Sequence, residues 1–420
     1  MHPNALLELC AELIAVVNKL DAPADSTVSA FFRQHKNLGQ RERASLAETV
    51  YALLRERVKF QNLAQSGSGP MPRRLAMLAW RGSDSFLRAA LSPMEQQWLT
   101  QVQAISVESL APRLRHNLPD WLAEPLRERL GEEEFWRLAA ALNEPAPLDL
   151  RVNTLKLKRE DAQAELAAAG IDAVPTPYSP LGLRIDGKPA INKLALFTSG
   201  GVEVQDEGSQ LLALLLAPKR GEMVVDFCAG AGGKTLALGA AMRNTGRLYA
   251  FDVSGHRLDA LKPRLARSGL SNVYPAQIAH ERDDRIKRLA GKIDRVLVDA
   301  PCSGLGTLRR NPDLKWRQSP QAVTELQAKQ RAILASAARL VKPGGRLVYA
   351  TCSLLDAENE VIAAEFAAAS PDFVPLDAAE ALSKAQVERS GEFVENGALR
   401  LWPHRNATDG FFAAAWERTA

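Results

Sequence analysis

The chain has 420 residues, of which 46% are hydrophobic and 24% are charged, and its formal net charge is +4 at pH 7. No apolar run is long enough to cross a bilayer, and the first residues lack the basic and apolar regions of a secretory signal. The composition suits a soluble protein of two or three domains, and the cysteine pattern described next favours a reducing cytoplasm. The mild basic charge is compatible with a polyanionic partner.

The cysteines provide neither a disulfide framework nor a metal-binding pattern. They are Cys10, Cys228, Cys302 and Cys352. Paired CxxC spacing is absent, so we expect reduced thiols and no metal site. We also expect a monomer, because the sequence shows no exposed apolar repeat.

Residues 1–115 carry apolar side chains at helical spacing. The segments Asn4–Lys19 and Arg41–Phe60 both place apolar residues such as Leu and Val three or four positions apart. Strand-like alternation is absent from this region. We predict an all-helical domain over residues 1–115, whose basic side chains form either a solvated face or a surface that docks RNA.

Residues 116–200 mix helical and strand-like patterns, which predicts a small α+β module. Helices, an extended run, a further helix and a strand-like run follow one another: Trp121–Leu130, Glu133–Leu142, Leu148–Asn153, Arg159–Ala169 and Leu181–Ile185. The polar side chains in and after the extended run are either RNA contacts or charged strand edges in water. These side chains are Arg151, Asn153, Lys156 and Lys158.

Residues 201–420 alternate strand and helix, which predicts an α/β fold with a largely parallel, doubly wound sheet. The expected strands are Met223–Phe227, Arg247–Asp252, Asn272–Ile278, Ile293–Asp299, Gly345–Ala350 and Gly410–Trp416. The runs Ile293–Asp299 and Gly345–Ala350 are almost continuously apolar, as in strands buried on both faces. A long helix, Gln321–Val341, is expected between these two strands.

The first strand of the sheet ends in a glycine-rich loop that precedes a helix. The loop residues are Cys228, Ala229, Gly230, Ala231, Gly232, Gly233 and Lys234. Glycines let the backbone turn sharply and approach a ligand, and the free N–H groups at a helix start favour negative charge. Asp252 closes the next strand, where a carboxylate can accept hydrogen bonds from a ribose. The loop therefore predicts a nucleoside-bearing cofactor.

Two common phosphate-binding loops do not fit this stretch. A P-loop has a Gly separated by four residues from its Gly-Lys-Thr, and that position is Cys228. In a dinucleotide fingerprint begun at Gly230 and Gly232, the third glycine would fall on Thr235. A nucleotide hydrolase that uses Lys234 and Thr235 remains an alternative, which tight ATP binding would support.

Both central strands end in a turn that contains a cysteine. The turns are Asp299-Ala-Pro-Cys-Ser-Gly304 and Ala350-Thr-Cys-Ser353. Ligands of open α/β sheets bind beyond the carboxyl ends of the strands, so Cys302 and Cys352 are expected beside the glycine loop. A single cysteine is often only a small buried hydrophobe. Two cysteines at equivalent strand ends indicate an active site.

Thiols, a carboxylate and a nucleoside cofactor together suit methyl transfer to C5 of cytosine. C5 is too weak a carbon nucleophile to take a methyl group directly. A thiolate that adds to C6 converts the ring to an enamine-like species, and C5 can then attack a sulfonium methyl. The C5 proton leaves afterwards, and the thiol is eliminated.

Five segments carry a family resemblance: Asp226–Thr235, Asp299–Gly304, Asn311–Trp316, Ala350–Leu354 and Thr408–Phe412. They resemble the Nop/Sun family of S-adenosylmethionine-dependent RNA cytosine-C5 methyltransferases, in particular its bacterial Sun/Fmu type, which acts on 16S ribosomal RNA. The resemblance extends over residues 119–418. It implies a Rossmann-like class I methyltransferase domain over residues 201–420, a small RNA-binding module over 116–200 and a NusB-like RNA-binding domain over 1–115.

The resemblance also implies roles for individual residues. Cys352 would be the nucleophile on C6 and Cys302 would help to release the product, whereas the DNA cytosine methyltransferases use the Pro-Cys thiol as nucleophile. Asp299 would hold the cytosine edge and contact the cofactor region. Residues 228–234 would cradle the methionine part of S-adenosylmethionine, and Asp252 would bind its ribose.

One stretch departs from the family pattern. The family has a Gly-Asp pair near the adenine, and the corresponding residues here are Gln277–His280. Asp283 or Asp284 is a candidate substitute for the missing carboxylate. The departure leaves open a non-catalytic RNA-binding protein on the same scaffold, which would bind RNA without S-adenosylmethionine.

A cationic and aromatic cluster follows the first cysteine turn: Arg309, Arg310, Lys315, Trp316 and Arg317. Such side chains suit phosphates and a stacked base, and the alternative is an ordinary charged loop. The target cytosine must leave its stack to meet a thiolate, so a loop or single-stranded cytosine is expected. Ribosomal RNA is the expected partner, tRNA is the alternative, and no membrane partner is expected.

Overall fold

The structure, a computed structural model, describes residues 1–187 and 189–419. Contacts between residues divide the chain into two units. The first unit consists of Met1–Pro145 and Thr307–Pro320, and the second consists of Ala146–Gly306 and Gln321–Ala420. The segment that follows the first cysteine turn in the sequence therefore belongs to the first unit.

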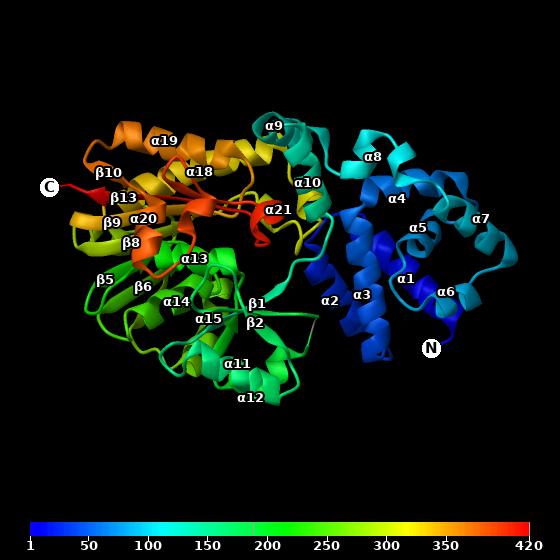
Figure 1. The fold of residues 1–420 in the computed structure, drawn as a ribbon, viewed down its shortest axis with the longest axis horizontal. Coiled ribbons are helices and arrows are strands. Elements are labelled where there is room, and N and C mark those ends of the chain that lie inside the picture. Colours follow the sequence, from blue (N-terminus) through cyan, green and yellow to red (C-terminus); the bar gives the residue numbers. More distant parts are fainter. Residues whose placement is uncertain (188, 420) are drawn as a thin grey trace. The chain divides into compact units, whose positions relative to one another are not determined.

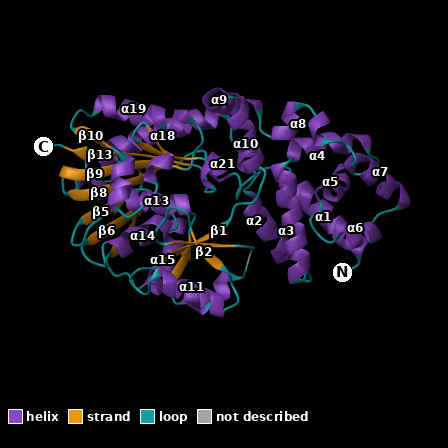
Figure 2. Ribbon diagram, in the orientation of Figure 1, coloured by secondary structure: helices purple, strands orange, loops and turns teal. Residues whose placement is uncertain are grey.

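The first unit is built from helices joined by turns (Figure 2). They are α1 (Pro3–Val17), α2 (Ala24–Gln34), α3 (Gln40–Arg55), α4 (Arg57–Leu63), α5 (Met71–Ala79), α6 (Asp84–Ala90), α7 (Pro93–Gln103), α8 (Pro112–His116), α9 (Asp120–Leu130), α10 (Glu132–Leu142) and α17 (Leu314–Arg317). Leu7, Ile14 and Leu46 lie fully buried where α1 and α3 pack. This unit includes α9 and α10, so it continues beyond the domain boundary expected at residue 115.

The second unit contains the expected parallel sheet. Its strands are β5 (Met223–Asp226), β6 (Arg247–Asp252), β7 (Val273–Gln277), β8 (Ile293–Asp299), β9 (Val341–Thr351), β10 (Phe373–Leu376), β11 (Val394–Glu395), β12 (Ala398–Leu401) and β13 (Phe411–Arg418). They lie in the order β11-β12-β13-β9-β8-β5-β6-β7, and β10 pairs with β13. Strands β5 to β9 are parallel where they pair, whereas β13 runs antiparallel to β9.

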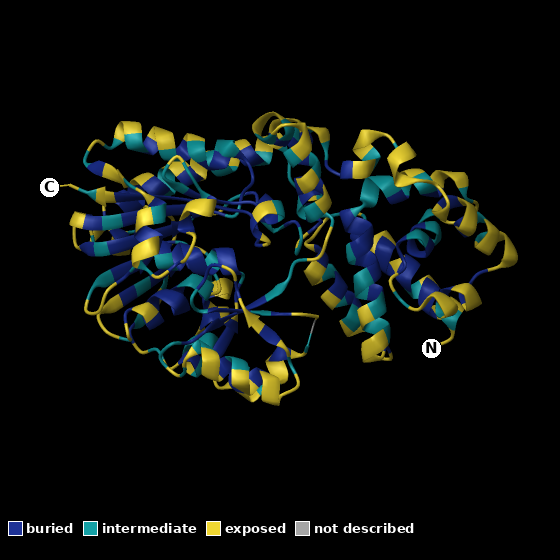
Figure 3. Ribbon diagram, in the orientation of Figure 1, coloured by how far each residue is buried: buried dark blue, intermediate teal, exposed yellow. Residues whose placement is uncertain are grey.

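Helices cover both faces of this sheet (Figure 1). They include α13 (Glu207–Leu216), α14 (Gly233–Ala241), α15 (Gly255–Ser268), α18 (Pro320–Ala338), α19 (Glu360–Ala369) and α20 (Ala378–Lys384). Leu297 of β8 packs with α13 and α14, while its neighbours Val296 and Val298 pack with α18 and α19. Period-two alternation thus buries β8 on both faces, as its apolar sequence predicts, and Figure 3 shows the central strands as buried.

Strand β9 begins earlier than expected because it contains a bulge. Val341 pairs with Ile293, and the next pair along the two strands joins Arg346 to Arg295, so β9 has extra residues between these pairs. Gly344 has a φ of +72°, a conformation that glycine adopts readily. The helix expected to reach Val341 ends at Ala338.

A small antiparallel sheet forms the α+β module, in the order β2-β3-β1-β4. Its elements are β1 (Leu148–Val152), β2 (Ala173–Pro175), β3 (Gly182–Ile185) and β4 (Val202–Val204), with α11 (Arg159–Ala168) and α12 (Ala195–Thr198). Leu150, Leu166 and Leu183 are almost completely buried in its core.

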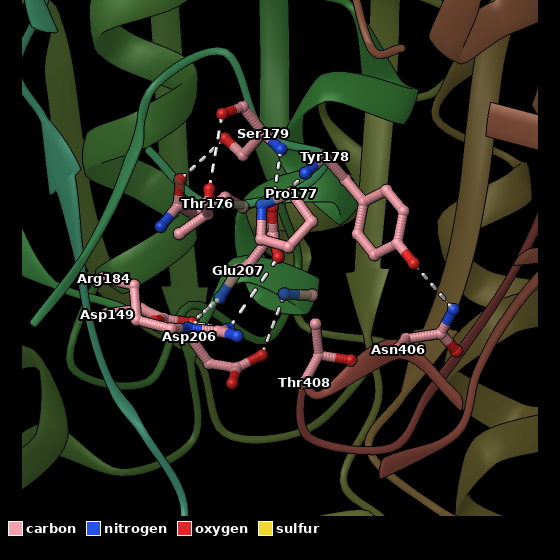
Figure 4. Close-up of polar contacts among 12 residues, drawn as sticks. Asp149, Thr176, Pro177, Tyr178, Ser179, Arg184, Asp206, Glu207, Asn406 and Thr408 are labelled. Carbon is pink, nitrogen blue, oxygen red and sulfur yellow. Dashed lines mark hydrogen bonds and ion pairs between the residues drawn. The ribbon is translucent and has the colours of Figure 1, made fainter. Parts of the chain in front are cut away.

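Buried polar contacts fasten this small sheet to α13 (Figure 4). Arg184 donates to both carboxylate oxygens of Asp149, at 2.7 and 2.9 Å. Glu207, the first residue of α13, accepts from the backbone N–H groups of Tyr178 and Ser179 at 2.5 and 2.7 Å. Burial raises the pKa of Glu207, although these N–H groups oppose the shift. The module is therefore held to the larger sheet by bonds made within one unit.

Candidate active site

Three neighbouring strands bring the site residues together. Strand β8 lies between β5 and β9 and is parallel to both, so the carboxyl ends of all three strands meet at one edge. The sulfur atoms of Cys302 and Cys352 lie 3.4 Å apart beyond these ends. Both cysteines are partly exposed, whereas Cys10 is buried in the first unit. The two thiols can therefore contact one ligand.

The surroundings of Cys302 favour its uncharged form. The hydrogen bond with Cys352 and then burial raise the pKa of Cys302 well above its usual range, and the negative charges of Cys352 and Glu358 act in the same direction. These effects favour the neutral thiol of Cys302.

An ion pair joins the glycine loop to the first cysteine turn. The Nζ atom of Lys234 lies 2.7 Å from Oδ2 of Asp299 and 5.6 Å from the centre of the Phe411 ring. Burial alone would lower the pKa of Lys234, but Asp299 outweighs burial, and the pKa is raised. Cys352 also interacts electrostatically with this ammonium group. A permanent positive charge therefore lies close to the thiol pair.

The glycine loop has a backbone conformation that requires its glycines. Gly230 and Gly232 have φ values of +56° and +83°, and a Cβ on Gly232 would lie 2.1 Å from the Leu261 side chain. The N–H of Gly230 donates to Oδ2 of Asp252 at 2.8 Å. A Cβ on Gly230 would face open space, so the loop leaves room at its backbone. This open backbone, bounded by a carboxylate that can accept from hydroxyls, fits a nucleoside-bearing cofactor.

The turn after β7 differs from the family pattern in its sequence but does contain a carboxylate. Asp283 accepts from the N–H groups of Ala279 and Arg285 at 3.0 and 2.9 Å. These bonds lower the pKa of Asp283. Asp284 instead pairs with Lys287 on the surface. Of the two candidate substitutes, Asp283 is the one that closes this turn.

The predicted RNA contacts of Arg151 and Asn153 in the small module are wrong, because both side chains are buried. Arg151 is 2% exposed, and its Nε atom donates to Gln205 at 2.6 Å. Burial lowers the pKa of Arg151 to about 10. Asn153 donates to the carbonyl groups of Gly200 and Ser268. Both side chains hold protein segments together and are not available to RNA.

The cluster after the first cysteine turn also has internal partners. Lys315 is 1% exposed and donates to the Arg55 carbonyl at 2.6 Å, and burial lowers its pKa to about 7. Trp316 donates to the Leu54 carbonyl at 2.8 Å, and Arg309 donates to the Pro145 carbonyl at 2.9 Å. The predicted direct contact of Lys315 with RNA is therefore wrong, because its ammonium group is buried and bonded within the protein. Arg310 is half-buried, and Arg317 is exposed.

Residues that anchor the two cysteine turns were missing from the sequence prediction. Ser303, Ser353 and Glu358 are buried and hydrogen-bonded to one another. The only hint in the sequence is that Cys302 and Cys352 are each followed by a serine. Across 1–187 and 189–419, no three His, Cys, Asp or Glu side chains gather in a way that could hold a metal ion.

Together, the doubly wound sheet, the glycine loop and the acidic end of β6 define a Rossmann-like fold, in which ligands bind beyond the carboxyl ends of the strands. Comparison with known families is more specific. Residues 213–417 match the family model of the 16S rRNA methyltransferase RsmB/F, and residues 118–192 match that of the RsmF/B-like ferredoxin-like domain. The chain belongs to the RsmB/F family of methyltransferases.

Individual relatives agree with this assignment. The chain is 38% identical over 301 residues to a probable ribosomal RNA small subunit methyltransferase B of Synechocystis, covering 71% of this chain and 66% of that protein. It is 33% identical over 341 residues to the protein of the same name in Bacillus subtilis, covering 80% and 74%. A methyltransferase homolog from Pyrococcus horikoshii has a similar structure, with 30% identity, a TM-score of 0.63, and coverage of 74% of this chain and 100% of that one.

No helix within the described part of the chain combines the length and the apolar character needed to cross a membrane.

Proposed function

We propose that the chain methylates C5 of a cytosine in 16S ribosomal RNA, through a covalent bond between a cysteine and C6. The observation that carries this proposal is the 3.4 Å separation of the Cys302 and Cys352 sulfur atoms beside the glycine loop. Two thiols at this separation can reach adjacent atoms of one pyrimidine ring. The names of the relatives in Synechocystis and Bacillus subtilis support small-subunit ribosomal RNA as the substrate.

The glycine loop and the end of β6 are suited to hold the methyl donor. Residues 228–234 would contact the methionine part of S-adenosylmethionine, and Asp252 would accept from its ribose hydroxyls. When bound, this cofactor supplies an electrophilic methyl group on a sulfonium. Asp283 is a candidate for the adenine side, because it closes the turn after β7.

Cys352 is the proposed nucleophile. The ammonium of Lys234 stabilises negative charge on this sulfur. The Cys302 sulfur lies within hydrogen-bonding distance of it, and in the proposed reaction the Cys302 thiol is the donor. The sulfur adds to C6, and the electrons of the C5–C6 double bond make C5 nucleophilic. Asp299 holds the polar edge of the cytosine, and its ion pair with Lys234 fixes the direction of its carboxylate.

Cys302 acts after C5 has taken the methyl group. Once Cys352 is bound to carbon, it can no longer carry the charge that raises the pKa of Cys302. Cys302 can then lose its proton to solvent, and the resulting thiolate accepts the proton from C5. The C5–H electrons re-form the C5–C6 double bond, and the bond from C6 to Cys352 breaks. The product is 5-methylcytosine with both cysteines free.

A labelling experiment tests the reaction and the substrate together. The purified chain would be incubated with methyl-labelled S-adenosylmethionine and, in parallel, with unmodified 16S rRNA and unmodified tRNA. Nucleosides would then be separated and identified by mass spectrometry. We expect label in 5-methylcytidine from 16S rRNA. Label only in tRNA would contradict the substrate, and label in another nucleoside would contradict the cytosine chemistry.

A further inference from the structure

A buried carboxylate joins the two cysteine turns. Glu358 ends the short 3-10 helix η5 (Asp356–Glu358) that follows the second turn, and its side chain is 0% exposed. Its Oε1 atom accepts from the N–H of Ser303 at 2.8 Å and from Nε2 of Gln330 at 3.0 Å. Its Oε2 atom accepts from the hydroxyl groups of Ser303 and Ser353. One side chain therefore bonds both turns at the same time.

The two serines directly follow the two active-site cysteines. The hydroxyl oxygens of Ser303 and Ser353 lie 3.2 Å apart, and the sulfur atoms of Cys302 and Cys352 lie 3.4 Å apart. The serines are buried, whereas the cysteines are partly exposed. The turns thus meet through two successive residues, one pair facing the protein interior and the other accessible to solvent.

Helix α18 and strand β9 hold this carboxylate from outside the turns. Gln330 of α18 donates both to Glu358 and to the carbonyl of Pro301, at 3.0 Å each. The hydroxyl of Tyr349 on β9 donates to the backbone carbonyl of Glu358 at 2.6 Å. Buried hydrogen-bond networks of this kind restrict the motion of their members.

We propose that Glu358 is a positioning residue that sets the separation of the two thiols by holding both cysteine turns together. This inference rests on the proposed function and deepens it. The carboxylate acts through Ser303 and Ser353, which fix the backbone on which each sulfur is carried. Without it, two buried hydroxyls lose their acceptor and the turns can separate.

The negative charge of Glu358 also faces Cys302. It adds to the effects of the Cys352 hydrogen bond and of burial, which raise the pKa of Cys302, while the N–H of Gly304 opposes them. Tyr349 interacts electrostatically with Cys302, and Lys234, which pairs with Asp299, interacts with Cys352. Removal of the Glu358 charge should therefore lower the pKa of Cys302.

The full-length variant Glu358→Gln tests this role, because it keeps the size of the side chain and removes its charge. Alkylation of each thiol by iodoacetamide, followed peptide by peptide across pH, reports ionisation without RNA or cofactor. We expect the midpoint for Cys302 to move down by about one pH unit. We also expect kcat for RNA methylation to fall by about 100-fold with KM for RNA unchanged, since small misplacements of reacting groups slow the chemical step.

A control removes a similar charge from the neighbouring helix. Glu365 of α19 is 48% exposed and pairs with Arg331 at 2.6 Å, so Glu365→Gln should leave both readouts at the wild-type level. An unchanged Cys302 profile in folded Glu358→Gln overturns the proposal. Thermal unfolding shows whether Glu358→Gln folds. If it does not fold, Ser353→Ala is used instead, because it removes one hydrogen bond to the Glu358 carboxylate. An unchanged kcat in Ser353→Ala overturns the proposal.

These results can be separated from failure of the proposed function. If the wild-type protein methylates no RNA, the proposed reaction is contradicted. The alkylation profiles of the wild type and Glu358→Gln still decide whether Glu358 controls the ionisation of Cys302.

Discussion

The ammonium group of Lys234 lies 2.7 Å from the carboxylate of Asp299, so an ion pair connects the loop after β5 with the end of β8. The two side chains are only 11% and 29% exposed. Charges in such a site interact more strongly than charges in water, because the surrounding dielectric is lower. The pair orients Asp299 and places positive charge beside Cys352.

Replacement of Lys234 by methionine should therefore impair the chemical step. Without the ammonium, negative charge on Cys352 loses its counter-charge and Asp299 loses its partner. We expect kcat to fall by about 100-fold in Lys234→Met, as measured by single-turnover methylation. Lys262→Met is the matched control, because Lys262 is 70% exposed in its pair with Asp259. Equal rates for Lys234→Met and the wild type would contradict the role of this charge.

Mild oxidation should link the thiols of Cys302 and Cys352. One molecule of hydrogen peroxide oxidises two thiols to one disulfide and is reduced to two molecules of water. The sulfurs of Cys302 and Cys352 are 3.4 Å apart, and closure to a bond of about 2.05 Å is a small movement. We expect a Cys302–Cys352 peptide in a non-reducing map, with methylation lost and then restored by dithiothreitol.

The other cysteines provide the controls for this oxidation. Burial raises the pKa of Cys10 to about 12, so Cys10→Ser should oxidise like the wild type. A link from Cys302 to Cys228, or no link at all, would be inconsistent with the site geometry.

Asp226 should make the stability of the fold depend on pH. Burial raises its pKa to about 7, and the hydrogen bond from Thr235 at 2.7 Å only partly opposes this shift. The pKa of an Asp in the unfolded chain is about 3.9. Between this pKa and that of the folded state, the folded protein binds more protons than the unfolded protein. The contribution of Asp226 to the free energy of unfolding is thus present below about pH 4 and is lost as the pH rises toward about 7.

Urea titrations of the wild type and Asp226→Asn across this interval test the effect. The stability of the wild type relative to the variant should decrease as the pH rises, because the amide does not titrate. A difference that stays constant with pH would show that Asp226 keeps an ordinary pKa.

Substitutions of Lys315 and Arg317 should have different effects, the first on thermal stability and the second on RNA affinity. Lys315→Met should alter the thermal stability of the protein, because the buried ammonium bonds the carbonyl of Arg55. It should leave the salt dependence of RNA affinity unchanged. Arg317→Ala should weaken RNA binding and reduce the slope of log affinity against log salt by about 0.7, the value for one phosphate contact on a single strand. A reduced salt slope in Lys315→Met with an unchanged slope in Arg317→Ala would show that Lys315 contacts RNA.

The sequence was most informative where burial imposes a continuous apolar run. Strands β6 and β8 have the bounds expected for them, and both end in a carboxylate, Asp252 and Asp299. The proximity of the two cysteine turns could also be predicted, because neighbouring parallel strands end at the same edge of a sheet. The short strands β10 to β12 have too few residues to produce a recognisable period.

The hydrogen-bond partners of Glu358 and Lys315 could not be predicted from the sequence, because they depend on tertiary packing. Glu358 lies in an acidic stretch at the start of a helix, and its sequence resembles that of a solvated helix end. Lys315 looks equally like a surface cation. Their burial arises from segments distant in sequence, Ser303 and Gln330 around Glu358 and Arg55 beside Lys315.

In the proposed reaction, Cys352 forms the covalent bond and Cys302 is needed to break it. The most direct measurement is a denaturing gel of Cys302→Ala and Cys352→Ala after incubation with 16S rRNA and S-adenosylmethionine. We expect Cys302→Ala to accumulate a protein–RNA adduct of reduced mobility and Cys352→Ala to form none. An adduct only in Cys352→Ala, or in neither variant, would contradict the claim.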